Sequence, residues 1–201
     1  MKLRIILIFL LCPLGVNAMD LGTSFGVGDG TYLMSFHGSF RGQRFLKDLE
    51  LGIGGRYTAF FGSDYTTNPV IDTEQEIIIQ NPMVHAVNIS FFSSYKLTNS
   101  LMMGFNIDLL GLSFGPARPS SDFSNGFDGS PTQLNIFKGA SNDEGTLNSE
   151  FWLGYLVSSK ILLKAGFAHF VGEYETTQSQ TDGNNRFRKF NNFLFIGINF
   201  T

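Results

Sequence analysis

Hydrophobic and polar residues alternate with a period of two at the end of the chain, in residues 189–201. One set of alternate positions there holds Leu194, Ile196, Ile198 and Phe200. The positions between them hold Phe193, Phe195, Gly197 and Asn199. Because alternate side chains of a β-strand leave opposite faces, this pattern predicts a strand with one continuous apolar face.

The same alternation recurs in seven earlier segments. They cover residues 19–27, 31–40, 48–61, 83–97, 101–113, 147–157 and 160–171. Most reach the roughly 9–11 residues that a tilted strand needs to cross a bilayer. In one segment, 101–113, the pattern blurs at the end, where Leu110 and Leu112 both interrupt it. The pattern therefore predicts eight strands.

The connections between these segments alternate in length. Counting back from the C-terminus, they are long (172–188), short (158–159), long (114–146), short (98–99) and long (62–82), then moderate (41–47) and tight (28–30). Outer-membrane barrels have an even number of strands, short periplasmic turns and long outer loops. A sheet in hydrocarbon must also close on itself, because lipid cannot hydrogen-bond a free edge. We therefore predict an all-β, eight-stranded, antiparallel up-and-down transmembrane β-barrel.

The first 18 residues read as a signal peptide. Lys2 and Arg4 precede an apolar run, and a small-residue cleavage site ends at Ala18. The apolar run is too short for a spanning helix. Lipidation of Cys12 is disfavoured because Leu11 stands where a lipoprotein leader needs a small residue. We expect a single mature domain, residues 19–201.

The composition further limits the class of protein to which the chain can belong. Loss of the leader removes two of the 14 basic residues and none of the 17 acidic ones, which leaves a net charge of −5. A mildly acidic chain without a basic cluster lacks the positively charged surface that is typical of nucleic-acid-binding proteins. The chain also holds 22 Phe and 23 Gly, which fits a barrel with an apolar outer wall.

The leader, the eight alternating segments, the strand-turn-strand at 93–101 and the penultimate Phe200 together resemble the small bacterial outer-membrane β-barrel superfamily, which includes the OmpA transmembrane domain, OmpX and OmpW. One departure is that Thr201, not an aromatic residue, is last. The resemblance implies that the protein is located in the bacterial outer membrane, in contact with outer-membrane lipid. It also implies that the barrel-assembly machinery inserts the protein and that the protein is a monomer.

Five charged residues fall on the strand faces opposite the apolar ones. They are Glu50, Arg56, Asp108, Glu150 and Lys164. The interior of an eight-stranded barrel is barely wide enough for side chains. Because an unpaired buried charge is costly, we expect these residues to form a paired polar network that plugs the lumen. The alternative is a narrow conduit lined by the same residues.

Catalytic and metal chemistry have little support. The chain has three histidines, His37, His85 and His169, and none shows the serine and carboxylate partners of a hydrolase. Residues 122–128 place oxygen ligands at alternate positions, but they lack the closing Glu of an EF-hand loop. We therefore predict no enzyme, cofactor or metal.

Function is then expected in the outer loops, since loops on a rigid scaffold are free to vary. We predict a structural or surface-interaction role for residues 62–82, 114–146 and 172–188. The alternatives are a narrow pore or transporter for a small solute and a lipid-modifying outer-membrane hydrolase. A soluble β-sandwich or a calycin-like secreted barrel also stays open.

Overall fold

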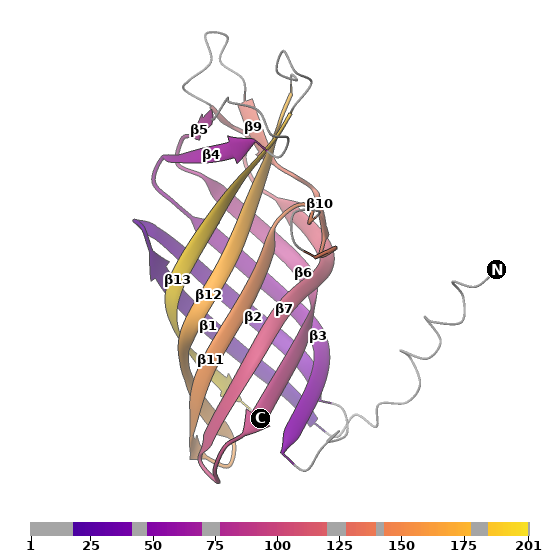
Figure 1. The fold of residues 1–201 in the computed structure, drawn as a ribbon, viewed down its shortest axis with the longest axis vertical. Helices are drawn as coiled ribbons and strands as arrows, with labels where there is room; N and C mark the ends of the chain where they lie inside the picture. The colour runs from indigo at the N-terminus through magenta and orange to yellow at the C-terminus, as the bar shows by residue number, and fades with distance from the viewer. Residues whose placement is uncertain are drawn as a thin grey trace, which may run out of the picture.

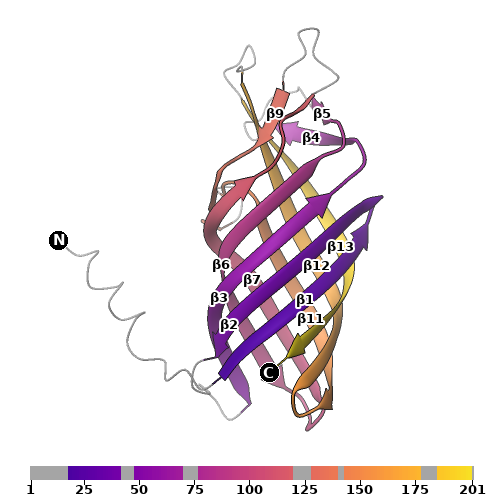
Figure 2. The ribbon, with the colours of Figure 1, turned by 180° about the vertical axis from the view of Figure 1, so that it is seen from behind.

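Eight long strands form a closed antiparallel barrel in the computed structural model, which describes residues 18–41, 48–69, 77–119, 128–139, 143–177 and 185–200. The barrel strands are β1 (Ala18–Gly28), β2 (Thr31–Arg41), β3 (Leu49–Phe61), β6 (Met83–Lys96), β7 (Leu101–Phe114), β11 (Leu147–Ser158), β12 (Ile161–Thr176) and β13 (Arg186–Phe200). Each pairs with the next along the chain, and β13 closes the ring on β1 from Leu21↔Phe200 to Val27↔Leu194 (Figures 1 and 2). The predicted fold is confirmed.

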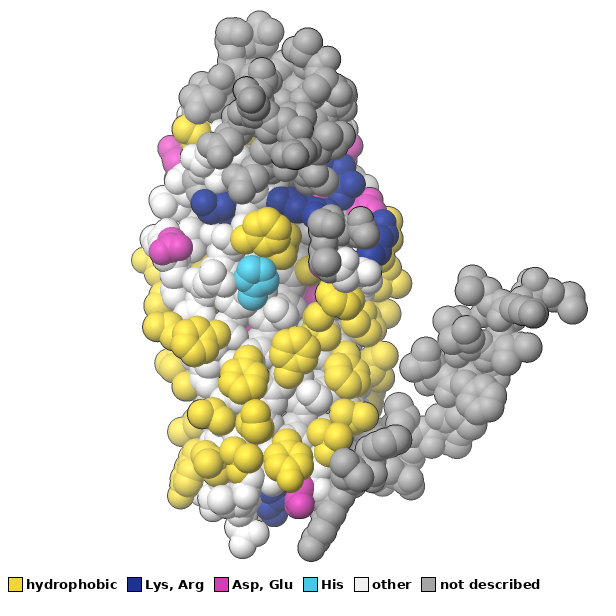
Figure 3. Space-filling view, viewed as in Figure 1, with side chains coloured by type: hydrophobic (Ala, Val, Ile, Leu, Met, Phe, Trp, Pro, Cys, Tyr) yellow, Lys and Arg dark blue, Asp and Glu magenta, His cyan; other side chains and the backbone are white. Residues whose placement is uncertain are grey.

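The exterior of the barrel is apolar, as the alternation predicts. In β13, Leu194 and Ile196 are 60% and 69% exposed, whereas Phe193 and Phe195 are 1% and 4% exposed. Figure 3 shows the apolar side chains as a broad band across the face in view, with charged side chains gathered above it and at the lower rim. A closed sheet with this outer surface is suited to hydrocarbon, where all backbone hydrogen bonds must be made within the protein.

The blurred pattern in β7 has a structural cause. Ile89 of β6 pairs with Leu110, but the next residue of β6, Ser90, pairs with Asp108. Leu109 is therefore the extra residue of a β-bulge, which shifts the parity of the strand by one. Leu110 and Leu112 consequently face outward, at 46% and 59% exposure.

The two ends of the barrel differ. Short turns join β6 to β7 and β11 to β12 at one end, which we call the turn end, and β1 begins and β13 ends there (Figure 1). The opposite end, the loop end, carries the longer connections. The β1–β2 turn at the loop end is tight: Asp29 and Gly30 both have positive φ, 45° and 71°. This is the backbone of a type I′ hairpin turn.

The loop end is more regular than the sequence predicts. Five short strands lie there: β4 (Tyr65–Pro69), β5 (Ile77–Ile79), β8 (Arg118–Pro119), β9 (Asp128–Pro131) and β10 (Leu134–Ile136). In addition, β12 and β13 stay paired up to Glu175↔Arg186. The expected loop 172–188 is therefore strand at both of its ends, in 172–176 and 186–188, and the expected loops 62–82 and 114–146 are partly strand. β9 and β10 pair with β12 and β7, which are distant in sequence, so local alternation did not reveal them.

The short strands continue the barrel wall at the loop end. β11 pairs with β7 only as far as Ser149↔Ile107, and beyond that point β10 takes its place beside β7. β9 pairs with the end of β12 in the same way, and β4 pairs with β13 and β5. The described residues contain no helix long and apolar enough to cross a membrane. The expected signal peptide lies outside the described residues except for Ala18, which begins β1.

Candidate functional site

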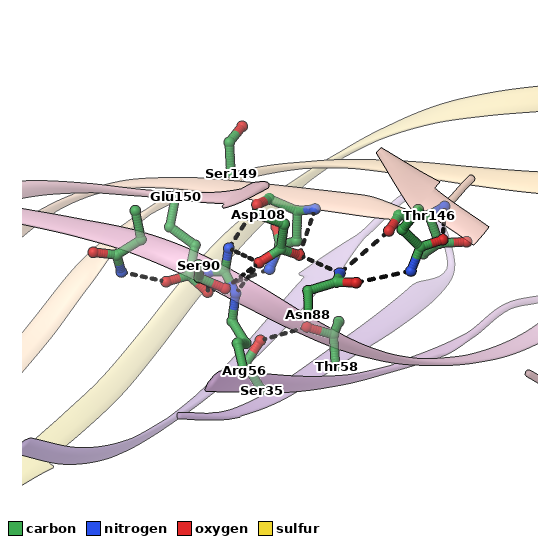
Figure 4. Close-up of polar contacts among 12 residues, drawn as sticks. Ser35, Arg56, Thr58, Asn88, Ser90, Asp108, Thr146, Ser149 and Glu150 are labelled. Atoms are coloured by element: carbon green, nitrogen blue, oxygen red, sulfur yellow. Dashed lines mark hydrogen bonds and ion pairs between the residues drawn. The ribbon is translucent and has the colours of Figure 1, made fainter. Parts of the chain in front are cut away.

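An ion-paired cluster lies inside the barrel and joins three strands (Figure 4). Arg56 of β3 donates to Asp108 Oδ1 of β7 from Nε at 2.8 Å and from Nη2 at 2.6 Å. Its Nη1 lies 3.2 Å from Glu150 Oε1 of β11. We call these three residues the ion-pair layer. All three are fully buried or nearly so, and removing one partner of such a pair costs about 3–5 kcal/mol.

Hydrogen bonds satisfy the remaining oxygens of the two carboxylates. Asp108 accepts from Ser90 Oγ at 2.6 Å, Asn88 Nδ2 at 2.8 Å and the Asn148 amide at 2.9 Å. Glu150 accepts from Asn106 Nδ2 at 2.8 Å. These donors come from β6, β7 and β11, so the layer ties four neighbouring strands together.

The same network continues from the barrel interior into the chain at the loop end. Asn135 of β10 donates from Nδ2 to Asn88 Oδ1 at 2.8 Å. Asn135 Oδ1 accepts from Ser113 Oγ at 2.6 Å and from the Thr146 amide at 2.7 Å. Asn135 is completely buried, so its amide fixes β10 and Thr146 to the polar network of the barrel interior.

A glycine next to Thr146 allows the chain to approach Asn135 this closely. Gly145 has a φ of 75°, and a Cβ there would meet the Leu134 carbonyl oxygen at 2.1 Å and Asn135 Oδ1 at 2.3 Å. Only glycine suits both the left-handed backbone and the close approach. On the exposed side of the same loop, Lys138 Nζ donates to Glu144 Oε2 at 2.8 Å, and this hydrogen bond lowers the pKa of Glu144.

A second set of buried residues fills the interior nearer the loop end. Phe60 and Phe170 stack at 4.9 Å between ring centroids, and Phe193 packs edge-on against them at 6.2 and 6.4 Å. We call these three rings the aromatic layer. Ile77 and Ile79 of β5 belong to the same apolar cluster, so the β4–β5 hairpin packs onto the layer from the loop end (Figure 1).

The turn end holds a small polar cavity of about 40 Å³. Lys164 and Trp152 line it, and the ammonium group of Lys164 lies 5.4 Å from the centre of the indole ring. Arg41 is paired with Asp20 and, through Nη1 at 2.9 Å, with Glu50 Oε2. A volume of this size holds a few water molecules at most.

The structure thus divides the five charged residues expected in the lumen. It brings Arg56, Asp108 and Glu150 together, whereas Lys164 lies over Trp152 and lines the turn-end cavity. Glu50 lies apart, at the turn end with Arg41. Sequence reasoning missed Arg41, because it counted that residue as part of the connection 41–47. It also missed Asn135, whose only local signal is a polar residue between Leu134 and Ile136.

The three histidines lie far from hydrolase geometry. His85 bonds the Tyr57 hydroxyl at 2.7 Å on the outer wall, and His169 Nδ1 bonds Asn192 Oδ1 at 2.8 Å, also outside. Glu173, close to His169 in sequence, instead binds Arg186 and Arg188. Within the ranges that the structure describes, no histidine has a hydrogen bond to a serine or a carboxylate.

The described residues contain no group of three or more His, Cys, Asp and Glu side chains that would hold a metal ion. The oxygen-rich segment 122–128 lies outside the described residues apart from Asp128.

No protein-family profile and no curated protein matches the chain. Among solved structures, the chain is similar to Neisserial surface protein A, with 12% identity and a TM-score of 0.45, over 90% of this chain and 93% of that one. It is also similar to Ail, the attachment invasion locus protein of Yersinia pestis, with 9% identity and a TM-score of 0.40, over the same shares. The NanC porin follows, with 11% identity and a TM-score of 0.26, over 92% of this chain and 100% of that one.

Sequence identities and TM-scores this low do not indicate an activity. The geometry of the chain itself defines the class of protein. A closed, antiparallel, eight-stranded sheet with an apolar exterior and a polar, ion-paired interior is a small transmembrane β-barrel.

Proposed function

We propose that the chain is a monomeric bacterial outer-membrane barrel, exported through a cleaved signal peptide at residues 1–18, that conducts no solute and presents a folded surface for binding outside the cell. The loop end faces the exterior and the turn end the periplasm, in keeping with the rule for loop lengths in such barrels. Its general partners are outer-membrane lipid and the barrel-assembly machinery.

The observation that carries the proposal is the double closure of the interior. The ion-pair layer lies inside the barrel, where Glu150 also accepts a hydrogen bond from Ser24 of β1 at 3.4 Å, and the aromatic layer fills the interior nearer the loop end. A solute would have to separate a buried, hydrogen-bonded ion pair and also part three packed phenylalanines. The narrow-pore alternative meets both barriers.

The surface role is supported by the way the outer chain is held. β10 and Thr146 are bonded to the barrel interior through Asn135, and β4, β9 and β10 extend the barrel wall. A segment with a fixed shape loses less conformational entropy when it binds a partner. This arrangement suits recognition better than a freely moving loop would.

Two measurements test the proposal. Refolded full-length protein in planar bilayers should show no discrete conductance steps, and steady single-channel currents would refute the closed interior. Separately, bacteria expressing the chain should attach to surfaces or to one another more than cells without it. Replacement of residues 115–139 by a Gly-Ser chain of equal length should abolish that gain, and unchanged attachment would refute the surface role.

A further inference from the structure

A notch in the lipid-facing wall lies where β7, β11, β12 and β13 meet the chain of the loop end. Its lining includes Ile107, Ser149, His169 and Phe190, and its volume is about 300 Å³. These residues are neighbours: Ser149 pairs with Ile107 and with His169, and the His169 ring stacks on Phe190 at 5.8 Å between ring centroids. They all belong to the outward face of their strands.

One small side chain makes the notch. The outward positions of β11 toward the turn end carry large residues: Phe151, Leu153, Tyr155 and Val157. Ser149 continues that series with a side chain too short to fill the wall. Phe137 and Asp143, from the chain that follows β10, line the notch from the loop end. Leu147 and Val171 also line the notch, and they are only 4% and 8% exposed although they lie on the outward face.

The polar groups that line the notch are hydrogen-bond acceptors. His169 Nδ1 bonds Asn192 Oδ1 at 2.8 Å, and in the tautomer that donates from Nδ1 the other ring nitrogen, Nε2, is an acceptor. Asp143 uses Oδ1 to accept from the Lys138 and Gly139 amides, both at 2.7 Å, and Oδ2 takes no hydrogen bond from the described residues.

We propose that this notch binds an amphiphile with an aliphatic tail and a head group that donates hydrogen bonds, such as an ammonium or hydroxyl group. The tail would lie against Ile107, Leu147 and Phe190, continuous with the lipid-facing belt. The head would meet the Asp143 carboxylate and His169 Nε2. This site is independent of the loop-end surface proposed above, because it opens into the membrane.

The three histidines make the test selective. Full-length protein with ¹⁵N-labelled histidine, in phosphatidylcholine nanodiscs, should give three imidazole spin systems. His85 also lies on the lipid-facing wall, beside Tyr57 and Phe114, and serves as an internal control. Substitutions of each histidine by glutamine assign the signals.

Two probes of equal charge and tail length isolate the hydrogen bond: dodecylammonium, which has N–H donors, and dodecyltrimethylammonium, which has none. Dodecylammonium should shift the His169 signals saturably and bind at least about tenfold more tightly than its trimethyl analogue, as expected for hydrogen bonds to a charged group. The His85 signals should stay in place. Parallel, unsaturable shifts of both histidines, or equal affinity for both probes, would overturn the proposal.

Two variants locate the site. Ser149→Phe fills the notch and should abolish the saturable shift, whereas Ala165→Phe adds a ring to the lipid face of β12 outside the notch and should leave it intact. Asp143→Asn keeps the Oδ1 acceptor for the loop amides but removes the charge, and should weaken dodecylammonium binding about tenfold. Heat-modifiable migration confirms that each variant folds. A full response in folded Ser149→Phe would refute the site.

Discussion

Arg56 and Asp108 lie on strands that are not adjacent, yet two hydrogen bonds, at 2.8 and 2.6 Å, join the guanidinium of one to a single carboxylate oxygen of the other. β6 runs between their strands and contributes Asn88 and Ser90 to the same carboxylate. The pair therefore braces three strands from the inside.

Loss of this pair should destabilise the barrel strongly. Arg56→Gln leaves Asp108 and Glu150 as buried carboxylates without their guanidinium partner, and we expect a loss of about 3–5 kcal/mol in the free energy of unfolding. Urea titration of protein refolded into vesicles measures it. Arg41→Gln, at the more exposed turn end, is the matched control and should cost far less. A loss below about 1 kcal/mol for Arg56→Gln would contradict the account.

Because two layers close the interior, disrupting only one of them should not open the lumen. Phe170→Ala removes one ring of the aromatic layer and should cost about 3–5 kcal/mol, typical of a buried phenylalanine. Planar-bilayer recordings should nevertheless stay silent, because the ion-pair layer still crosses the barrel. The lipid-facing variant Phe167→Ala, on the same strand, controls for general effects. Channel activity in Phe170→Ala would show that the polar layer leaks.

Asn135 should control the order of the chain at the loop end. Asn135→Ala leaves Asn88 Oδ1, Ser113 Oγ and the Thr146 amide without their partner, and each unsatisfied buried group costs about 1–3 kcal/mol. Hydrogen exchange should accelerate in residues 134–146 while the barrel strands stay protected. Asn99→Ala, in an exposed turn, should change nothing. Unchanged protection of residues 134–146 would contradict a docking role.

The bulge at Leu109 makes a prediction about deletions. Removing Leu109 joins Asp108 and Leu110 into a regular ladder, so every side chain keeps its face and the protein should still fold. Removing Ile107 instead shifts one part of β7 by a single residue, and a one-residue slip exchanges the two faces. Heat-modifiable migration after refolding should be retained in the first deletion and lost in the second. The reverse result would mean that the bulge is not at Leu109.

The sequence by itself determined the barrel strands and their faces. A strand has a period of two, so the alternation of Tyr32, Met34 and Phe36 with Leu33 and Ser35 assigns each side chain to lipid or lumen without knowledge of any partner. The alternation of long and short connections was equally local, and it was enough to set the antiparallel order of the strands.

Only the tertiary structure decided which interior residues meet. Glu50 and Arg56 share one face of β3, yet Glu50 pairs with Arg41 at the turn end and Arg56 with Asp108 in the middle. Such pairs depend on the register between strands, which local alternation does not set. The short strands β9 and β10 and the amide of Asn135 depend likewise on partners far along the chain. Periodicity is a property of neighbouring residues, whereas pairing is a property of the closed barrel.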